Sequence, residues 1–210
     1  DQVDFFKQNG FLHLPNAICR SQLETLQAFT SRLEHENTES ASPLYQGAAV
    51  FGDQNKILMR QNDLHAVNAE LSLKLLSSSS LMSVAQTICG PGAIPLQMDV
   101  FYKQPGLAGS VGWHRDASYR KANCYINVGV YLDDAKFSDG CLRYLAASHT
   151  HPINNLKPED LSDEPLSKWV ECEVKAGDIL LHDMRLLHCS SQKKTSGPRR
   201  TIYVEMSTFK

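Results

Sequence analysis

Apolar residues recur at helical spacing in the first part of the chain. Between positions 21 and 36, Leu23, Leu26, Phe29 and Leu33 fall on one face, and charged residues occupy the opposite face. A period of three to four residues predicts an amphipathic helix over 21–36. The same reasoning predicts helices over 4–10 (ending at a glycine), 65–77 and 80–89, and a covering loop over the polar residues 37–56.

From position 94 onward the pattern changes to short segments that alternate between apolar and polar residues. Gly, Pro, Asp and Ser separate these segments at short intervals. Many short strands spaced in this way predict an antiparallel sandwich or barrel. Residues 150–168 contain three prolines and several acidic residues, and they predict a lid. The predicted strands are 94–103, 111–119, 123–132, 141–146, 169–174, 178–184 and 200–208, after an isolated strand at 11–14.

The composition narrows the class of partner. A chain of 210 residues suits one domain with a substantial core. Its 21 Lys and Arg against 23 Asp and Glu give a formal net charge of −2, without the basic surface that nucleic-acid binding requires. The sequence also lacks the run of about 18–20 apolar residues that a membrane helix needs. We therefore expect a small-molecule substrate, and neither a nucleic acid nor a membrane as partner.

The six cysteines contain no Cys-x-x-Cys pair. Because the chain also lacks a signal-peptide core, they predict free thiols and a cytoplasmic protein. The chain begins at Asp1 rather than at Met, which leaves an upstream targeting segment open.

His114 and Asp116 form the most informative pair of residues. In a strand, residues two apart point to the same face, so both side chains can reach one metal ion. A His-x-Asp pair alone is more often incidental than functional, but His188 can supply a third ligand. Two imidazoles and one carboxylate cover one face of a mononuclear non-haem Fe(II) ion and leave three positions open.

Two other histidines compete for the place of third ligand. His182 ends the apolar run Leu180-Leu181-His182, which favours a core or ligand-supporting role. His149 follows a predicted strand and is more typical of a structural hydrogen-bonding position.

Arg199 lies eleven residues after His188, at the start of the last predicted strand. A guanidinium there can hold a carboxylate through two parallel hydrogen bonds, a geometry that lysine cannot copy. Arg200 has the opposite facing, so one of the two arginines points inward and the other outward. Ser190 can donate a hydroxyl hydrogen bond to the same carboxylate.

An ordered set of motifs resembles the phytanoyl-CoA dioxygenase family of Fe(II)- and 2-oxoglutarate-dependent oxygenases. The resemblance covers nearly the whole chain, and the order of the motifs makes it specific although each motif alone is weak. The motifs are Phe5-x₄-Gly10-Phe11, Trp113-His114-Arg115-Asp116, Leu132-Asp133-Asp134-Ala135, Asp139-Gly140-Cys141-Leu142, Ser148-His149, Gly177-Asp178 and His188-x-Ser190 followed by Arg199.

The resemblance implies a mostly β fold with flanking helices, a double-stranded β-helix (a cupin-like jelly roll). It implies one dioxygenase domain over 1–210, with a helical part at 1–92 and a jelly-roll core at 93–210. By the same resemblance, Fe(II) is held by His114, Asp116 and His188, and 2-oxoglutarate by Arg199, Ser190, Asn127 and Tyr131.

The implied reaction consumes O₂ and 2-oxoglutarate, hydroxylates a C–H bond of a small molecule and releases succinate and CO₂. The carboxylate of Asp116 favours hydroxylation over halogenation, because halogenases of this type replace it with a small residue. An alternative remains open: a jelly-roll metal protein without oxygenase activity, either a zinc hydrolase or isomerase or a non-catalytic binding module. Arg199 with Ser190 discriminates between the two, because the alternative does not need them.

The sequence departs from the family's pattern at positions that affect substrate choice. Arg115 stands where the family usually has Gln, Ala146-Ala147 replace Pro-Gly, and Lys193 replaces Asn. Arg115 and Tyr119 flank the ligands, and we predict that they contact substrate. Arg60 is the other arginine for which we expect an inward role.

Overall fold

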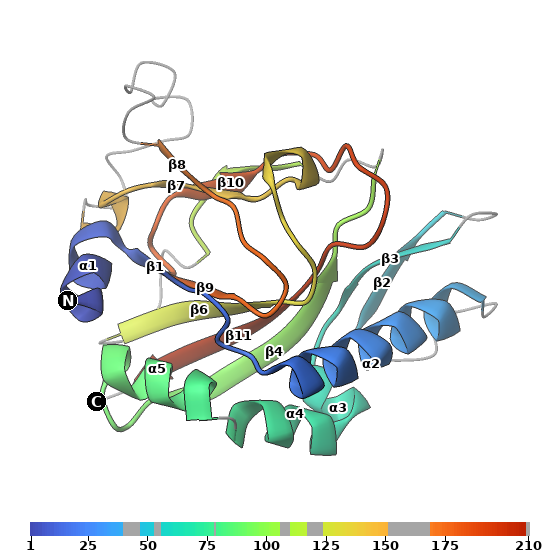
Figure 1. Cartoon of the computed structure of the whole chain (residues 1–210), viewed down its shortest axis with the longest axis horizontal. Coiled ribbons are helices and arrows are strands. Elements are labelled where there is room, and N and C mark those ends of the chain that lie inside the picture. Colours follow the sequence, from blue (N-terminus) through green and yellow to red (C-terminus); the bar gives the residue numbers. More distant parts are fainter. Residues whose placement is uncertain are drawn as a thin grey trace.

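Two antiparallel sheets face each other, and helices cover the outer face of the larger sheet (Figure 1). The computed structural model describes residues 1–39, 47–52, 56–77, 79–105, 110–116, 124–150 and 169–208. This is the jelly-roll architecture that the sequence predicts.

The larger sheet has seven strands in the order β1-β9-β6-β11-β4-β3-β2, and the smaller has four in the order β5-β10-β7-β8. The strands of the larger sheet are β1 (Phe11–Leu14), β2 (Ala48–Phe51), β3 (Ile57–Gln61), β4 (Ile94–Tyr102), β6 (Cys124–Tyr131), β9 (Ile179–Asp183) and β11 (Arg200–Thr208). Those of the smaller sheet are β5 (Val111–His114), β7 (Leu142–Leu145), β8 (Trp169–Cys172) and β10 (His188–Ser190).

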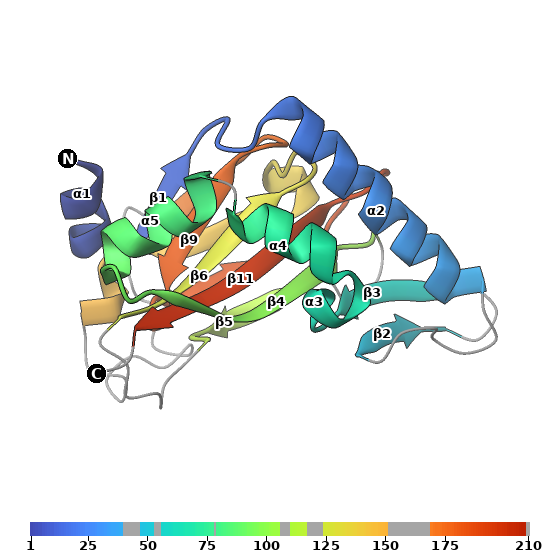
Figure 2. The same ribbon diagram turned by 90° about the horizontal axis from the view of Figure 1, so that it is seen from below.

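Helices lie across the larger sheet on the side away from the smaller sheet (Figure 2). Leu26 of one helix and Leu81 of another are fully buried in the same apolar cluster as Val128 and Val204 of the sheet. Burial of such apolar side chains stabilises the layered arrangement. The α-helices are α1 (Gln2–Asn9), α2 (Arg20–Glu39), α3 (Leu64–Val67), α4 (Ala69–Ser77) and α5 (Ser79–Cys89), and two short 3₁₀ helices span Phe137–Asp139 and Ser148–Thr150.

Alternation along β11 separates the two faces of the larger sheet. Ile202, Val204 and Met206 are buried toward the helices, whereas Tyr203 and Glu205 face the space between the sheets. The interior of the sandwich is therefore lined by polar as well as apolar residues, and that is where the site lies.

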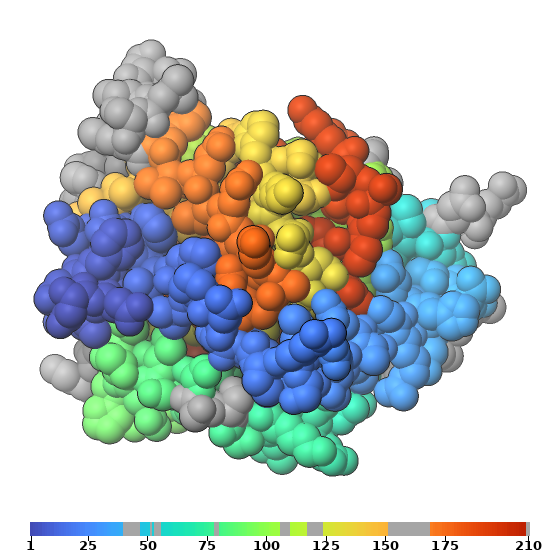
Figure 3. All heavy atoms as spheres, viewed as in Figure 1, coloured from blue at the N-terminus to red at the C-terminus, as the bar shows by residue number. Residues whose placement is uncertain are grey.

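The N-terminal segment closes one edge of the larger sheet. Gly10 ends α1 in the left-handed conformation (φ 83°), and β1 then pairs with β9. In Figure 3 the N-terminal residues, in blue, lie directly against the orange residues that include β9. A side chain at position 10 would collide with His149, whose Nδ1 would lie 2.5 Å from the added Cβ. Glycine is therefore required there for both conformation and space.

Most of the predicted elements are present, with differences at their ends. The helix predicted over 65–77 is divided into α3 and α4, because Asn68 adopts an extended conformation between them. The loop predicted over 37–56 is wrong in part, because it contains the end of α2 and the strand β2. The first 92 residues thus supply three strands as well as helices, and β3 and the short strand β10 were not predicted. Of the predicted lid, residues 151–168 lie outside the described residues.

The prediction that all six cysteines are free thiols is wrong. Cys89, at the end of α5, forms a disulfide with Cys124, at the start of β6. The two residues are 35 positions apart, so no local spacing pattern revealed the pair. The other four cysteines are free. Among the described helices, none combines the length and the apolar character that crossing a bilayer requires.

Candidate metal centre and adjoining cavity

Strand register brings the three predicted metal ligands together. His114 at the end of β5 is paired directly with His188 at the start of β10, and Asp116 lies two residues beyond His114. Asp116 Oδ1 lies 3.3 Å from His114 Nε2 and 3.5 Å from His188 Nε2. The three ligand atoms lie within 4.8 Å of one another, and this is the one such group among the residues that the structure describes.

Backbone carbonyls orient both imidazoles. His114 Nδ1 lies 2.8 Å from the carbonyl oxygen of Gly112, and His188 Nδ1 lies 2.9 Å from that of Leu186. Since a carbonyl only accepts, each Nδ1 carries the proton, and each Nε2 presents its lone pair to the centre. This is the arrangement in which neutral histidines ligate a metal.

The second oxygen of Asp116 is held by two donors. Asp116 Oδ2 accepts hydrogen bonds from His182 Nε2 at 3.0 Å and from Asn127 Nδ2 at 3.2 Å. His182 therefore hydrogen-bonds to Asp116, one of the three predicted ligands, and does not take the place of the third ligand, His188. His149 lies elsewhere, with its Nε2 3.1 Å from the carbonyl oxygen of Lys7.

The electrostatics favour a cation at this centre. Although burial opposes ionisation, the neighbouring imidazoles of His114 and His182 hold the pKa of Asp116 well below its usual range. Burial, together with the neighbouring His182, lowers the pKa of His188 to about 3, so its imidazole is neutral at neutral pH. The adjacent carboxylate of Asp116 raises the pKa of His114. A carboxylate with two imidazoles suits a divalent transition metal.

The centre opens into a cavity of about 510 Å³ between the two sheets. Its inner end contains Arg199, Lys103 and Ser190. Lys103 Nζ donates to Ser190 Oγ at 2.8 Å, and burial together with the charge of Arg199 lowers the pKa of Lys103 to about 8. Two buried cationic side chains at one end of a cavity favour an anionic ligand.

Arg199 lies at this end of the cavity, and the described residues supply no counter-ion for it. The side chain is 5 % exposed, and its Nε and Nη2 atoms have no hydrogen-bond partner among the described residues. Its guanidinium carbon lies 5.4 Å from the ring centre of Tyr131, which is itself fully buried. An unpaired buried guanidinium is costly unless a ligand pairs with it.

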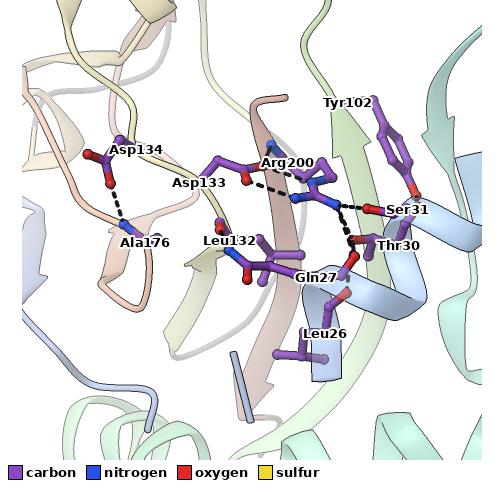
Figure 4. A network of polar contacts seen from close by, with 10 residues as sticks. All are labelled: Leu26, Gln27, Thr30, Ser31, Tyr102, Leu132, Asp133, Asp134, Ala176 and Arg200. Atoms are coloured by element: carbon purple, nitrogen blue, oxygen red, sulfur yellow. Dashed lines mark hydrogen bonds and ion pairs between the residues drawn. The ribbon is translucent and has the colours of Figure 1, made fainter. Parts of the chain in front are cut away.

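Arg200 points to the other face of the larger sheet. Figure 4 shows its guanidinium between Asp133 and helix α2, where it contacts both carboxylate oxygens of Asp133 and the helix residues Gln27, Thr30 and Ser31. Of the two adjacent arginines, Arg199 faces the cavity.

The remaining predicted residues divide into three groups. Asn127 and Ser190 line the cavity, as does Arg60 of β3. Arg115 does not line it, because its guanidinium donates to the backbone carbonyls of Ser148 and Arg185 behind β5. Tyr119 lies outside the described residues.

Lys103 is a cavity residue that the sequence analysis did not single out. It follows β4, and its backbone N–H donates to the carbonyl oxygen of Arg199 at 2.9 Å. Its place beside Arg199 depends on the pairing of β4 with β11, which no local motif encodes. A single lysine after a predicted strand carried no signal.

The outer wall of the cavity is polar. Asp99 accepts hydrogen bonds from Arg60, from Gln97 Nε2 at 2.9 Å and from the backbone N–H of Asp63 at 2.9 Å. The guanidinium carbon of Arg60 lies 4.5 Å from the ring centre of Phe101. On β11, Glu205 accepts a hydrogen bond from Tyr125 and also lines the cavity.

The chain is similar to known proteins over nearly its whole length. The methylphosphonate hydroxylase of Gimesia maris (strain ATCC 29201 / DSM 8797 / 534-30) is 22% identical over 207 residues, covering 97% of this chain and 78% of that protein. AviO1 from Streptomyces viridochromogenes Tue57 superposes with a TM-score of 0.84 at 25% identity, covering 99% of this chain and 93% of that one.

EctD from S. alaskensis, solved with bound Fe, has the same fold at a TM-score of 0.84 and 19% identity, covering 99% of this chain and 75% of that one. A second structure of EctD contains 2-oxoglutarate and 5-hydroxyectoine. The family described as phytanoyl-CoA dioxygenase (PhyH) matches residues 6–201. With nearly its whole length matched, the chain belongs to the phytanoyl-CoA dioxygenase family.

Proposed function

We propose that this protein is an Fe(II)- and 2-oxoglutarate-dependent dioxygenase that hydroxylates a C–H bond of a small, polar molecule. One observation carries the proposal: a His-Asp-His centre and an unpaired buried arginine share a single cavity. The first fits Fe(II), and the second fits the distal carboxylate of 2-oxoglutarate.

His114, Asp116 and His188 would hold the iron on one face. When bound, Fe(II) with 2-oxoglutarate and O₂ supplies an oxidant able to break a C–H bond, and 2-oxoglutarate leaves as succinate and CO₂. The chain's own contribution is to orient the three ligands and to keep the other positions free.

The inner end of the cavity would hold 2-oxoglutarate. Arg199 offers two free N–H directions, Lys103 adds a second cation, and Ser190 adds a hydroxyl. A carboxylate there would pair with both cations and relieve their mutual repulsion. Asn127, which lines the cavity, would contact the metal end of the co-substrate through the second N–H of its Nδ2, beside the N–H that donates to Asp116, and Tyr131 would form the floor beneath Arg199.

The outer wall would receive the substrate. Arg60, Asp99, Gln97 and Glu205 give it an uneven distribution of charge, beside the apolar side chains of Met59 and Phe101. A long acyl chain would remove water from these charged groups without offering them hydrogen bonds, which is unfavourable. We infer a polar substrate that offers hydrogen-bond donors to Glu205, in preference to a fatty acyl thioester.

Two competing functions make different demands on the site. A zinc hydrolase or isomerase built on the same ligands does not need two buried cations at the far end of the cavity. A non-catalytic module does not need an ordered ligand set. Arg199 and Lys103 therefore favour the oxygenase, and Asp116 favours hydroxylation over halogenation, which needs that ligand position free for a halide.

The experiment loads the protein with Fe(II) without oxygen, adds 2-oxoglutarate and measures its affinity, then admits air and measures succinate. We expect metal-dependent binding of 2-oxoglutarate and slow succinate release even without substrate. His114→Ala should lose metal binding, whereas Arg199→Ala should keep the metal and lose affinity for 2-oxoglutarate. Metal-loaded wild type that fails to bind 2-oxoglutarate would contradict the proposed function.

A further inference from the structure

A buried tyrosine and histidine stand in line behind the metal-ligand carboxylate. His182 on β9 is 1 % exposed, and Tyr144 on β7 is completely buried. Tyr144 Oη lies 3.0 Å from His182 Nδ1, and His182 Nε2 lies 3.0 Å from Asp116 Oδ2. The larger sheet supplies the imidazole and the smaller sheet the phenol, so the contact joins the two layers at the metal centre.

The chemistry of the three groups sets the direction of both hydrogen bonds. An ionised carboxylate only accepts, so His182 must carry a proton on Nε2 and donate it to Asp116. In the neutral imidazole Nδ1 then has a lone pair, which accepts from the Tyr144 hydroxyl. The opposite tautomer would place a lone pair against the carboxylate. Tyr144 therefore selects the tautomer in which His182 can hold Asp116.

The N-terminal motif encloses this pair. Phe11 lies opposite His182 in the β1–β9 register, and its ring stacks on Tyr144 with the ring centres 4.9 Å apart. Phe11 is 6 % exposed, so it covers the two polar groups on the side of β1. In such surroundings hydrogen bonds are stronger, and a missing partner costs more, than in water.

We propose that Tyr144 and His182 are positioning residues that make Asp116 a one-oxygen ligand. His182, with Asn127, holds Oδ2, which leaves only Oδ1 directed at His114 and His188. A carboxylate free to bind through both oxygens would occupy one of the positions that 2-oxoglutarate and O₂ need. This inference rests on the proposed function and adds to it the residues that keep the third open position.

The test measures metal and co-substrate binding separately, with Co(II) as the probe in place of Fe(II). Co(II) affinity is obtained from its absorption on titration, and 2-oxoglutarate affinity at saturating Co(II) from calorimetry. We expect His182→Leu to weaken Co(II) binding by about 10–100-fold and to weaken 2-oxoglutarate binding even when the metal site is full. His182→Gln retains an N–H donor and should recover most of both affinities. Tyr144→Phe should lie between them.

His13→Leu is the matched control. His13 Nε2 lies 2.8 Å from Asp178 on the neighbouring part of the sheet, so this variant also breaks a His–Asp contact but touches no metal ligand. Both affinities should stay at the wild-type level. Should His182→Leu fail to fold, the comparison of His182→Gln with Tyr144→Phe tests the same hydrogen bonds with smaller changes.

The outcomes separate the two proposals. Wild type that binds neither Co(II) nor 2-oxoglutarate overturns the proposed function and this inference with it. Wild type that binds both, alongside His182→Leu and Tyr144→Phe with unchanged affinities, overturns the positioning role and leaves the proposed function standing. A His182→Leu variant that loses metal affinity but binds 2-oxoglutarate normally at saturating metal overturns the one-oxygen argument.

Discussion

Replacing Arg200 should cost far more stability than replacing Arg199. The Arg200 guanidinium bonds both oxygens of Asp133 at 2.8 Å, the carbonyl of Gln27 at 3.0 Å and the hydroxyls of Thr30 and Ser31 (Figure 4). Arg200→Met keeps most of the volume but leaves a carboxylate of 12 % exposure without its partner. Breaking a buried pair in this way costs about 3–5 kcal/mol.

That loss is a large part of the total free energy of unfolding, since domains are stable by only about 5–15 kcal/mol. For a chain of this size each kcal/mol lowers the midpoint of thermal unfolding by roughly 2–4 °C, so that midpoint should fall by about 6–20 °C. Urea unfolding followed by circular dichroism measures the free energy of unfolding directly. In Arg200→Met/Asp133→Leu, which removes both charges, much of the loss should be recovered.

Arg199→Met is the matched control, one residue away on the same strand. Since Arg199 has no counter-ion among the described residues and lies beside Lys103, its removal should leave stability unchanged within about 1 kcal/mol or raise it. A cost of less than about 1 kcal/mol for Arg200→Met, or an equal cost for both variants, would refute the assignment of opposite roles.

Three further predictions follow from the cavity and the disulfide. Arg199→Met should weaken 2-oxoglutarate binding by about 10- to 150-fold, since a charge-assisted pair contributes roughly 1.5–3 kcal/mol. Calorimetry on metal-loaded protein measures this affinity, and a change below threefold would exclude Arg199 from that site. Lys103 must be charged to attract the carboxylate, and its pKa is about 8. The affinity for 2-oxoglutarate should therefore be constant at lower pH and fall above pH 8, by up to about tenfold per pH unit. Lys103→Met should remove this pH dependence, and a flat wild-type profile from pH 7 to 9 would contradict the prediction. The disulfide between Cys89 and Cys124 closes a loop of 35 residues, so the double variant Cys89→Ser/Cys124→Ser should lower the free energy of unfolding by about 4 kcal/mol. Identical urea unfolding curves for wild type with and without reductant would show that the bond does not form in solution.

Sequence periodicity predicted the elements that bury an extended apolar face. The helix around Leu26 and Leu33 and the long strands β4, β6 and β11 extend over enough residues for the period to be clear. β10 has only three residues, all buried, and a run of that length carries no period. The break at Asn68 and the pairing of β2 with β3 depend on tertiary contacts, which sequence patterns describe poorly.

The candidate metal-binding group was predictable because part of its geometry is local. The two-residue spacing of His114 and Asp116 places them on one side of the chain, and only His188 had to come from elsewhere. The position of Lys103 beside Arg199 depends on which strands become neighbours. So does the contact of Tyr144 with His182, behind Asp116. Residues of β6 and β9 contact that one carboxylate, β7 acts on it through His182, and no motif spans these strands.

The two arginines show where strand alternation stops being sufficient. Strand alternation establishes that one of Arg199 and Arg200 points inward, but by itself it does not say which of the two. The choice is made on the outer face, where Asp133 and the α2 hydroxyls engage the Arg200 guanidinium. Once those donors are committed, only Arg199 can offer N–H groups to a ligand. The contacts of Arg200 with Asp133 and α2 on the outer face, together with the free N–H groups of Arg199, therefore assign Arg199 to the cavity.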